Sequence, residues 1–266
     1  MNPIVLAIKV DVDTDRGTRV GVPNLLALFA EHDIDATFLF SLGPDNTGRA
    51  LRRLFRRGFL RKVLRTRVAS VYGWRTLLNG VLWPGPHIGR RNSDVMRRVK
   101  AAGHEVGIHC YDHIYWQDKL HGMTRQQVFA EFGRAQAEFL RIFGVAPRTA
   151  GSAGWQASGD SLAAYDAAGL DYASDVRGDS AFLPSLGDTI FHTPQIPTTL
   201  PTLDELLGRA EYPEARLTHD YFSLLRRDRH GQLHGEQAEQ GRELDDGVHR
   251  DRGGVLEGIA HGVADD

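Results

Sequence analysis

Two pairs of side chains with the potential for metal binding and acid–base chemistry occur in this sequence. Asp11 and Asp13 end one apolar run, and His109 and His113 follow another apolar run later in the chain. Two neutral imidazoles and one carboxylate form a three-ligand site for a divalent metal that leaves positions open for water. The remaining carboxylate could accept a proton from that water. Together the four residues predict a metal-dependent hydrolase.

Each pair also has a simpler interpretation, as turn or capping residues for the two aspartates and as a chance pair for the histidines. The surrounding sequence favours the chemical interpretation. Residues 4–10 predict a buried strand that ends at Asp11, and residues 105–108 predict a short strand that leads to His109. In parallel α/β folds, chemistry gathers at the carboxyl ends of the strands. We therefore expect the two pairs to meet at one edge of a sheet.

The order of apolar runs and turn residues predicts alternating strands and helices. Strands are expected at 4–12, 34–41, 104–109, 147–151 and 171–174, and helices at about 22–32, 92–102, 124–143 and 159–168. Asn92 or Ser93 is the expected cap of the second helix, and Thr124 that of the third. Repeated β–α units favour a parallel sheet, open or closed, and 266 residues suffice for one barrel-sized domain.

Composition restricts the class of protein further. A formal net charge of −2 identifies no partner, and an apolar content of 41% is ordinary for a globular protein. The single cysteine, Cys110, excludes an intrachain disulfide and is typical of a reducing compartment. The first residues lack the basic region of a signal peptide, and no uncharged apolar run approaches 18 residues. We expect neither a signal peptide nor a transmembrane helix.

Residues 43–91 interrupt the alternation with a basic segment. Between Asn46 and Ser93 there are eleven Arg, one Lys and no Asp or Glu. Within 49–67 the cations interleave with Leu, Phe and Val, which predicts a basic amphipathic helix. The alternatives are a solvated helix face, an anionic membrane surface, a phosphate-bearing substrate or nucleic acid. Neighbouring tryptophans and the lack of a nucleic-acid motif favour a membrane surface over nucleic acid.

A series of short motifs carries a family resemblance. They are Lys9-Val-Asp11-Val-Asp13-Thr14, Arg16-Gly17-Thr18-Arg19, His109-Cys-Tyr-Asp-His113, Ala153-Gly154-Trp155 and Ser174-Asp175-Val-Arg177-Gly178. Over about 4–229 the chain resembles the NodB-type polysaccharide deacetylases, and within them the 4-deoxy-4-formamido-L-arabinose-phosphoundecaprenol deformylases. The resemblance implies a distorted (β/α) barrel, which we expect to be incomplete at its C-terminal end.

The resemblance also implies roles for individual residues. Asp11 matches the catalytic base, and Asp13, His109 and His113 match the ligands of a divalent metal, zinc or another first-row ion. Arg148 falls near an arginine that many deacetylases hold against the base, although Arg148-Thr-Ala-Gly departs from their motif.

Three further positions are implicated in the same way. Asp175 and Arg177 fall where a carboxylate and a cation orient the base or a catalytic imidazole, and Trp155 would form a wall of the acyl pocket. Asp175 could instead be a turn residue at a strand end, and Trp155 could be a packed core residue. A backbone amide near Trp155 would help to hold the oxyanion.

The implied reaction is deformylation of an amino sugar linked to undecaprenyl phosphate, giving formate and the free 4-amino sugar. It would serve lipid A modification and polymyxin resistance, with the protein bound peripherally to the cytoplasmic side of the bacterial inner membrane through residues 49–67. Two alternatives stay open. One is a broader carbohydrate N-deacetylase that uses the same centre, and the other is a membrane-associated binding protein without catalytic activity.

The C-terminal segment departs from the family pattern. The family places a histidine, the general acid, in a Thr-x-His-Ala-Glu-like strand, but residues 230–266 contain no aromatic residue, eight Gly, four His and nine Asp or Glu. This composition predicts a disordered tail after a catalytic domain at 1–229. His234-Gly-Glu236 resembles the motif weakly. We interpret the segment as an altered reading frame or a replaced C-terminus, which leaves the general acid unassigned and could impair activity.

Overall fold

A computed structural model of the chain describes residues 6–50 and 76–206. The chain divides into two compact units, residues 1–54 with 68–199, and residues 55–67 with 200–266. Every described candidate site residue belongs to the first unit. Of the second unit, only residues 200–206 are described, and they include α8 (Leu203–Leu206). Most of the basic segment 49–67, the tail 230–266 and His234 lie outside the described residues, so the predicted domain limits stay predictions.

The first unit is built on a parallel sheet whose strands follow one another in chain order. The strands are β1 (Lys9–Val12), β2 (Thr37–Ser41), β3 (Glu105–Cys110), β4 (Thr149–Ala150) and β5 (Tyr172–Ala173). All four pairings are parallel, and the order never reverses, as in a barrel rather than a doubly wound sheet. The predicted α/β fold is confirmed. Within the described residues, the sheet does not close.

The sheet is nevertheless strongly curled. The Nζ atom of Lys9, on β1, donates a hydrogen bond of 3.1 Å to the carbonyl oxygen of Ser174, directly after β5. In a flat sheet these two strands would lie roughly 19 Å apart, because neighbouring strands are about 4.8 Å apart. A single lysine side chain could not cross that gap. The first and fifth strands therefore face each other across a concave surface.

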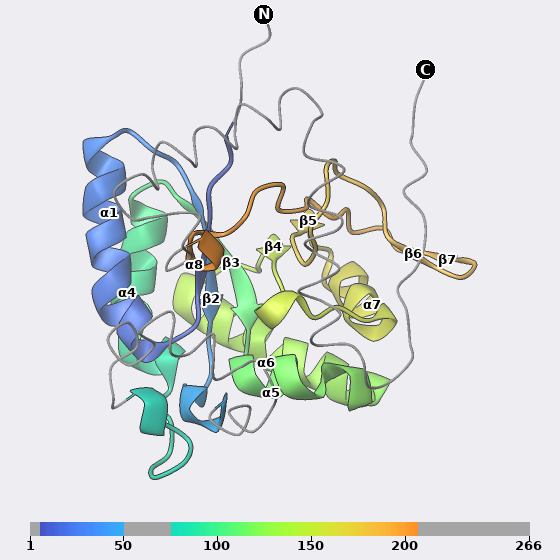
Figure 1. The fold of residues 1–266 in the computed structure, drawn as a ribbon, viewed down its shortest axis with the longest axis horizontal. Coiled ribbons are helices and arrows are strands. Elements are labelled where there is room, and N and C mark those ends of the chain that lie inside the picture. The colour runs from blue at the N-terminus through green and yellow to red at the C-terminus, as the bar shows by residue number, and fades with distance from the viewer. Residues whose placement is uncertain (1–5, 51–75, 207–266) are drawn as a thin grey trace, which may run out of the picture. The chain divides into compact units, whose positions relative to one another are not determined.

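Four helices cover the opposite, convex face. They are α1 (Val22–Glu31), α4 (Ile88–Ala101), α6 (Arg125–Phe143) and α7 (Gly159–Ala168), and each packs on the next (Figure 1). Fully buried Phe38 and Phe40 of β2 belong to the core between sheet and helices. Thr124 begins α6 with the expected cap, here a capping box with Gln127, and Gly144 ends the helix at φ 69°.

Helix α4 differs from its predicted limits. It begins at Ile88 instead of 92, and His87 provides the cap by accepting from the Arg90 amide. Asn92 lies inside the helix with non-helical backbone angles, and its buried Nδ2 donates to Asp15 and to the Ile88 carbonyl. A capping side chain accepts a hydrogen bond from a backbone amide in the first turn of its helix. The Asn92 side chain instead donates, to Asp15 and to the carbonyl oxygen of Ile88.

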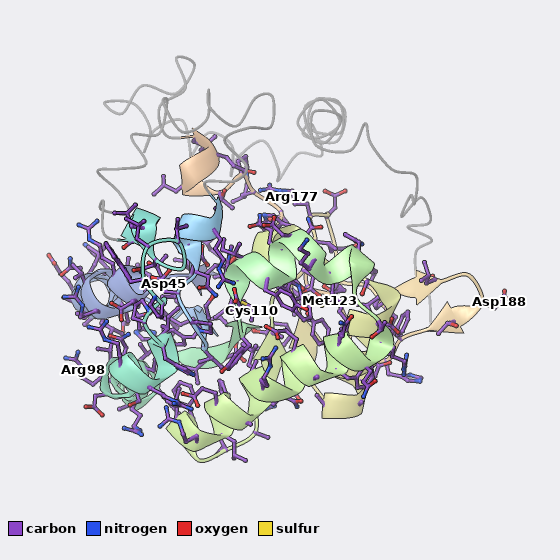
Figure 2. All side chains as sticks on the ribbon, turned by 90° about the horizontal axis from the view of Figure 1, so that it is seen from below. Asp45, Arg98, Cys110, Met123, Arg177 and Asp188 are labelled. Atoms are coloured by element: carbon purple, nitrogen blue, oxygen red, sulfur yellow. The ribbon has the colours of Figure 1, made fainter. Side chains whose placement is uncertain are left out.

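Several short elements were not predicted. Among them, helix α5 (His113–Lys119) begins directly after β3, and the strands β6 (Ser185–Leu186) and β7 (Thr189–Ile190) form a short antiparallel hairpin. Asp188 marks the hairpin tip, far from Cys110 in the middle of the sheet (Figure 2). No helix in the described part of the chain is both long and apolar enough to cross a bilayer.

Gly107, in the central strand β3, packs closely against both neighbouring strands. A Cβ atom at Gly107 would lie 2.6 Å from the Thr149 carbonyl oxygen and from Leu39 Cδ2. We expect Gly107→Ala to lower the free energy of unfolding by about 1–3 kcal/mol, the usual cost of overpacking. Gly133→Ala on α6, where nothing lies within 4 Å, is the matched control and should raise it by about 0.5–1 kcal/mol. Urea unfolding of both variants measures the free energy of unfolding. An unchanged free energy for Gly107→Ala would contradict the close packing around Gly107.

Candidate metal centre

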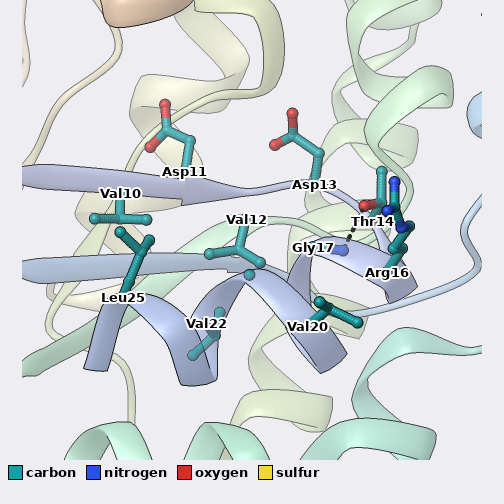
Figure 3. A pocket seen from close by; sticks show the side chains of 11 residues that line it. Val10, Asp11, Val12, Asp13, Thr14, Arg16, Gly17, Val20, Val22 and Leu25 are labelled. Atoms are coloured by element: carbon teal, nitrogen blue, oxygen red, sulfur yellow. Dashed lines mark hydrogen bonds between the residues drawn. The ribbon is translucent and has the colours of Figure 1, made fainter. Parts of the chain in front are cut away.

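The alternation of β1 places three charged side chains on the concave face of the sheet. Successive side chains of a strand point to opposite faces, so Lys9 and Asp11 share one face, and Asp13 continues it. Figure 3 shows Asp11 and Asp13 on one side of the strand and Val10 and Val12 on the other. The apolar pair turns towards α1, and the carboxylates turn towards the concave surface.

Three of the predicted residues form a compact cluster at the carboxyl edge of the sheet. Asp13 Oδ1 lies 3.2 Å from His109 Nε2 and 3.6 Å from His113 Nε2. One ligand atom from each residue lies within 4.8 Å of the others, and the two imidazole rings are 5.3 Å apart between centroids. The sequence prediction that β1 and β3 bring these residues together is therefore correct in geometry. Their role as metal ligands is a proposal.

The hydrogen bonds around His109 test whether this cluster fits a cation. His109 Nδ1 lies 2.7 Å from the carbonyl oxygen of Gly151, which can only accept, so Nδ1 carries a proton. In the neutral ring, Nε2 then presents a lone pair to Asp13 Oδ1, a buried atom that makes no hydrogen bond within the described residues. Two lone pairs at 3.2 Å repel unless a positive charge lies between them. Two imidazoles and a carboxylate, arranged in this way, fit a divalent cation.

The electrostatics of the cluster agree with that assignment. Burial on its own raises the pKa of Asp13, but the neighbouring His113 and His109 hold the pKa of this carboxyl well below its usual range. Burial lowers the pKa of His109, and the carboxylates of Asp11 and Asp13 more than offset it, so that the pKa is raised. The lowered pKa keeps Asp13 ionised, and the raised pKa of His109 shows that a positive charge beside the two carboxylates is favoured.

A buried polar network fixes the turn that presents His113. Asp112 caps α5 by accepting from the Tyr115 amide. The same carboxylate accepts from Asn46 Nδ2 at 2.6 Å, and the Asp112 backbone amide donates to Glu131 Oε1 at 3.0 Å. Glu131 is fully buried on α6. His113 is thus held by side chains from two distant segments that share no motif with it.

Lys9 is a site residue that the sequence interpretation missed. Its Nζ lies 3.6 Å from Asp11 Oδ2 and 4.5 Å from the centroid of the Trp155 ring. The guanidinium of Arg177 lies 5.0 Å from the same ring. Lys9 thus connects the proposed base to the proposed pocket wall, and Arg177 contacts the same wall. The two-residue spacing from Asp11 could have revealed it, because both side chains must share a face.

Trp155 has an unusual backbone that aims its side chain. Its φ is +60°, and Gly154 before it has φ +61°. A Cβ atom at Gly154 would lie 2.3 Å from Gln117 Nε2, so only glycine fits there. The Trp155 amide, a predicted oxyanion donor, already donates to the Ser152 carbonyl at 3.3 Å. The indole, in contact with Lys9 and Arg177, is therefore the part of this residue that faces the site.

The position of Arg148 argues against its predicted role beside the base. It precedes β4, whereas the metal cluster follows the carboxyl ends of β1 and β3. Its side chain is 79% exposed and pairs with Asp171, the residue before β5. Arg148 therefore lies at the amino end of β4 and pairs away from the cluster. The cation beside Asp11 is Lys9 instead.

Asp175 is buried below the site. Its side chain is fully buried and accepts from the Ser152 amide at 2.6 Å and from Gln195 Nε2 at 2.9 Å. The hydroxyl of Tyr165, also fully buried, is 3.4 Å away. These bonds join the ends of β4 and β5 to the loop that carries Gln195. A catalytic role for Asp175 stays a prediction. In this position the carboxylate would act through the groups that it holds, the Ser152 amide and the Gln195 side chain.

The burial of Asp175 predicts a pH dependence of stability. Burial raises the pKa of Asp175, and the hydrogen bonds from Gln195 and Ser152 offset only part of the rise. The folded state then favours the protonated carboxyl. Asp175 therefore adds to the free energy of unfolding when it is protonated. This addition is present in full below about pH 4, the ordinary pKa of an aspartate, and is lost as the pH rises through the raised pKa of Asp175 in the folded state. Urea unfolding at a series of pH values should show a smaller loss in Asp175→Asn than in the wild type. Equal losses would contradict this.

A cavity of about 370 Å³ lies along β1 and the π-helix Gly17–Gly21. Its lining includes Val10, Val12, Val20 and Leu25, whose side chains lie on the helix side of the strand (Figure 3). Asp11 and Asp13 also line the cavity, but their carboxylates turn away from these apolar side chains. We therefore place the reacting carboxylates on the concave side of the strand, opposite the apolar side chains.

Comparison with known proteins shows which family the chain belongs to. The family model for polysaccharide deacetylase matches residues 9–173. Over 227 residues the chain is 41% identical to a protein of Shewanella sediminis (strain HAW-EB3) described as a probable 4-deoxy-4-formamido-L-arabinose-phosphoundecaprenol deformylase, covering 85% of this chain and 73% of that protein. A protein of Wigglesworthia glossinidia brevipalpis with the same description is 33% identical over 193 residues, covering 72% and 67%. The solved structure of PuuE allantoinase is 18% identical, with a TM-score of 0.48, covering 88% of this chain and 58% of that chain.

The family model and the two sequence relatives together show the family. By sequence, this chain belongs to the polysaccharide deacetylase family.

Proposed function

We propose that the chain is a metal-dependent deformylase of 4-deoxy-4-formamido-L-arabinose linked to undecaprenyl phosphate. The reaction breaks the formamide C–N bond with water and releases formate and the 4-amino sugar. The observation that carries the proposal is the Asp13, His109 and His113 cluster with Asp11 on the same face of β1. The substrate class rests on the relatives described as probable deformylases, at 41% and 33% identity.

The residues of the site divide into those that hold a cation and those that act on water and substrate. Asp13, His109 and His113 would hold a divalent ion, zinc or another first-row metal. Such an ion supplies Lewis acidity, which polarises an amide carbonyl and makes water more acidic. Asp11 is 31% exposed, makes no metal contact in this assignment and is placed to accept the proton of the attacking water.

The remaining candidates shape the pocket around the formamide. The indole of Trp155 provides an apolar wall, and Arg177 on its face provides a cation at the rim for an anionic substrate. Asp175 holds the Ser152 amide and so fixes the loop that leads to Trp155. The general acid that protonates the leaving amine stays unassigned, and His234, which resembles the family motif only weakly, lies outside the described residues.

Membrane association belongs to the same proposal and rests on the sequence. A substrate carried on undecaprenyl phosphate resides in a bilayer, and residues 49–67 combine Arg and Lys with Leu, Phe and Val. Such a segment binds anionic lipid surfaces peripherally. We propose that the chain acts at the cytoplasmic side of the bacterial inner membrane, in lipid A modification and polymyxin resistance. Nucleic acid is not an expected partner.

The test is release of formate by the purified, zinc-loaded chain. The substrate is a short-prenyl phosphate carrying 4-deoxy-4-formamido-L-arabinose, compared with its N-acetyl counterpart. Proton NMR detects formate and acetate directly. Formate release that depends on added zinc supports the proposal, whereas no formate release by a folded, zinc-loaded chain contradicts it.

The family match favours one second candidate, a broader carbohydrate N-deacetylase with the same centre. N-acetylglucosamine oligomers in the same assay discriminate the two functions. Acetate release from these oligomers, with none of formate from the prenyl-linked sugar, would favour the second candidate. Repeating the assay after removal of residues 230–266 shows whether this segment contributes anything essential.

A further inference from the structure

The ammonium group of Lys9 joins three segments that are far apart in the sequence. It donates to the Ser174 carbonyl after β5 at 3.1 Å, pairs with Asp11 on β1 at 3.6 Å and lies 4.5 Å from the centroid of the Trp155 ring. An ammonium group has three donors and no acceptor, so a carbonyl, a carboxylate and a π face are all suitable partners. The ammonium group thus connects the first and fifth strands, the two edge strands of the curled sheet.

The partial burial of Lys9 stabilises these contacts. Its side chain is 19% exposed, which limits how far water can replace the three partners. A Cβ atom at Gly151 would lie 2.9 Å from the Ser174 carbonyl oxygen and 3.6 Å from Lys9 Nζ, so the glycine leaves room for the carbonyl that accepts from the lysine. Gly151 accepts the His109 Nδ1 hydrogen bond as well. Lys9 therefore sits against the backbone that orients a proposed metal ligand.

Asp11 depends on Lys9 for its orientation. Within residues 6–50 and 76–206, Lys9 is the one lysine or arginine within 4 Å of this carboxylate, and no hydrogen bond to another group restrains it. Asp13, two residues later, has the two imidazoles instead. Without this ion pair, the carboxylate can adopt other rotamers.

We propose that Lys9 is a positioning residue that holds the Asp11 carboxylate and the Trp155 indole in place across the concave face. The inference rests on the proposed function, because it takes Asp11 as the group that accepts the proton of water. Lys9 acts through Asp11 and Trp155 and does not itself touch the reacting atoms. Its loss should therefore affect turnover more than substrate binding.

The test compares Lys9→Met, which keeps the length of the side chain, with Lys9→Arg, which keeps the charge. We expect kcat of Lys9→Met to fall by about 10- to 100-fold, since a misplaced reacting group costs up to about 100-fold. KM should stay within about threefold, as for the loss of an interaction that acts in the transition state. Lys9→Arg should recover most of the kcat. The exposed Lys100→Met on α4 is the matched control and should behave as the wild type.

Three further measurements separate positioning from a loss of structure. Zinc content and circular dichroism of Lys9→Met should equal those of the wild type. Its tryptophan emission should differ from the wild type, and the difference should vanish when the same pair is compared in a Trp155→Phe background. Unchanged kcat, a failure of Lys9→Arg to recover activity, or a change confined to KM would each overturn the proposal.

Crystal structures of the wild type and Lys9→Met keep the test independent of the assay. If the zinc-loaded wild type releases neither formate nor acetate, the proposed function fails. The positions of Asp11 and Trp155 in the two crystal structures then decide the role of Lys9. A shift or a second conformer of either side chain in Lys9→Met supports the assignment, and unchanged positions overturn it.

Discussion

Replacing both His109 and His113 with alanine is expected to abolish zinc binding and formamide hydrolysis together. Asp13 Oδ1 lies 3.2 and 3.6 Å from the two imidazole nitrogens, so the double variant leaves one carboxylate in place of a three-ligand site. A metal ion contributes several kcal/mol to stabilisation of charge in the transition state, and about 4 kcal/mol corresponds to roughly a 1,000-fold change in rate. We therefore expect kcat/KM to fall by about 1,000-fold or more.

Zinc bound per chain, measured by elemental analysis after dialysis, is the direct readout. His32→Ala with His192→Ala removes two exposed imidazoles and serves as the matched control. The control should keep both zinc and activity. Wild-type zinc content in the His109→Ala, His113→Ala variant would show that the metal binds elsewhere and would remove the basis of the proposed site.

The second large effect is expected from Asp11→Asn, which should lose turnover and keep zinc. The amide has the shape of the carboxylate but cannot accept a proton from water, and general-base catalysis contributes about 100- to 10,000-fold. Since Asp11 is not among the proposed ligands, the zinc content should stay at the wild-type value. Asp13→Asn should lose both, which distinguishes the two neighbouring carboxylates.

Asp35→Asn, a change at an exposed carboxylate, is the control for the loss of one negative charge. It should leave kcat and zinc content unchanged. If Asp11→Asn loses zinc, Asp11 is a ligand, and the division of roles between the two aspartates is wrong. If Asp11→Asn keeps full activity, another group accepts the proton.

Most of the fold was predictable from local pattern. The five strands of the parallel sheet and the helices α1, α6 and α7 lie within the predicted segments or end within a residue or two of them. Periodicity and caps are properties of adjacent residues, so a single sequence contains them. Helix α4 shows the limit of this approach. Its predicted cap, Asn92, bonds to Asp15, a residue 77 positions away that no local pattern indicates.

The site divides in the same way. The types and spacing of Asp11, Asp13, His109 and His113 already predicted a hydrolytic metal centre, because parallel strands must present their carboxyl ends on one edge. The sequence resemblance also indicated Trp155 and Arg177, and in the structure the Arg177 guanidinium lies over the Trp155 ring. What the sequence determined by itself was therefore the chemistry and the edge of the sheet where it lies.

Only the tertiary structure decided which side chains reach that chemistry. The curl of the sheet brings Lys9 of β1 to the Ser174 carbonyl beyond β5, and the same curl buries Asp175 below the surface. Arg148 lies at the opposite ends of the strands and pairs with Asp171. Distances across a curled sheet depend on its twist and packing, which arise from many residues at once. For that reason the sequence named the proposed base but not the lysine beside it.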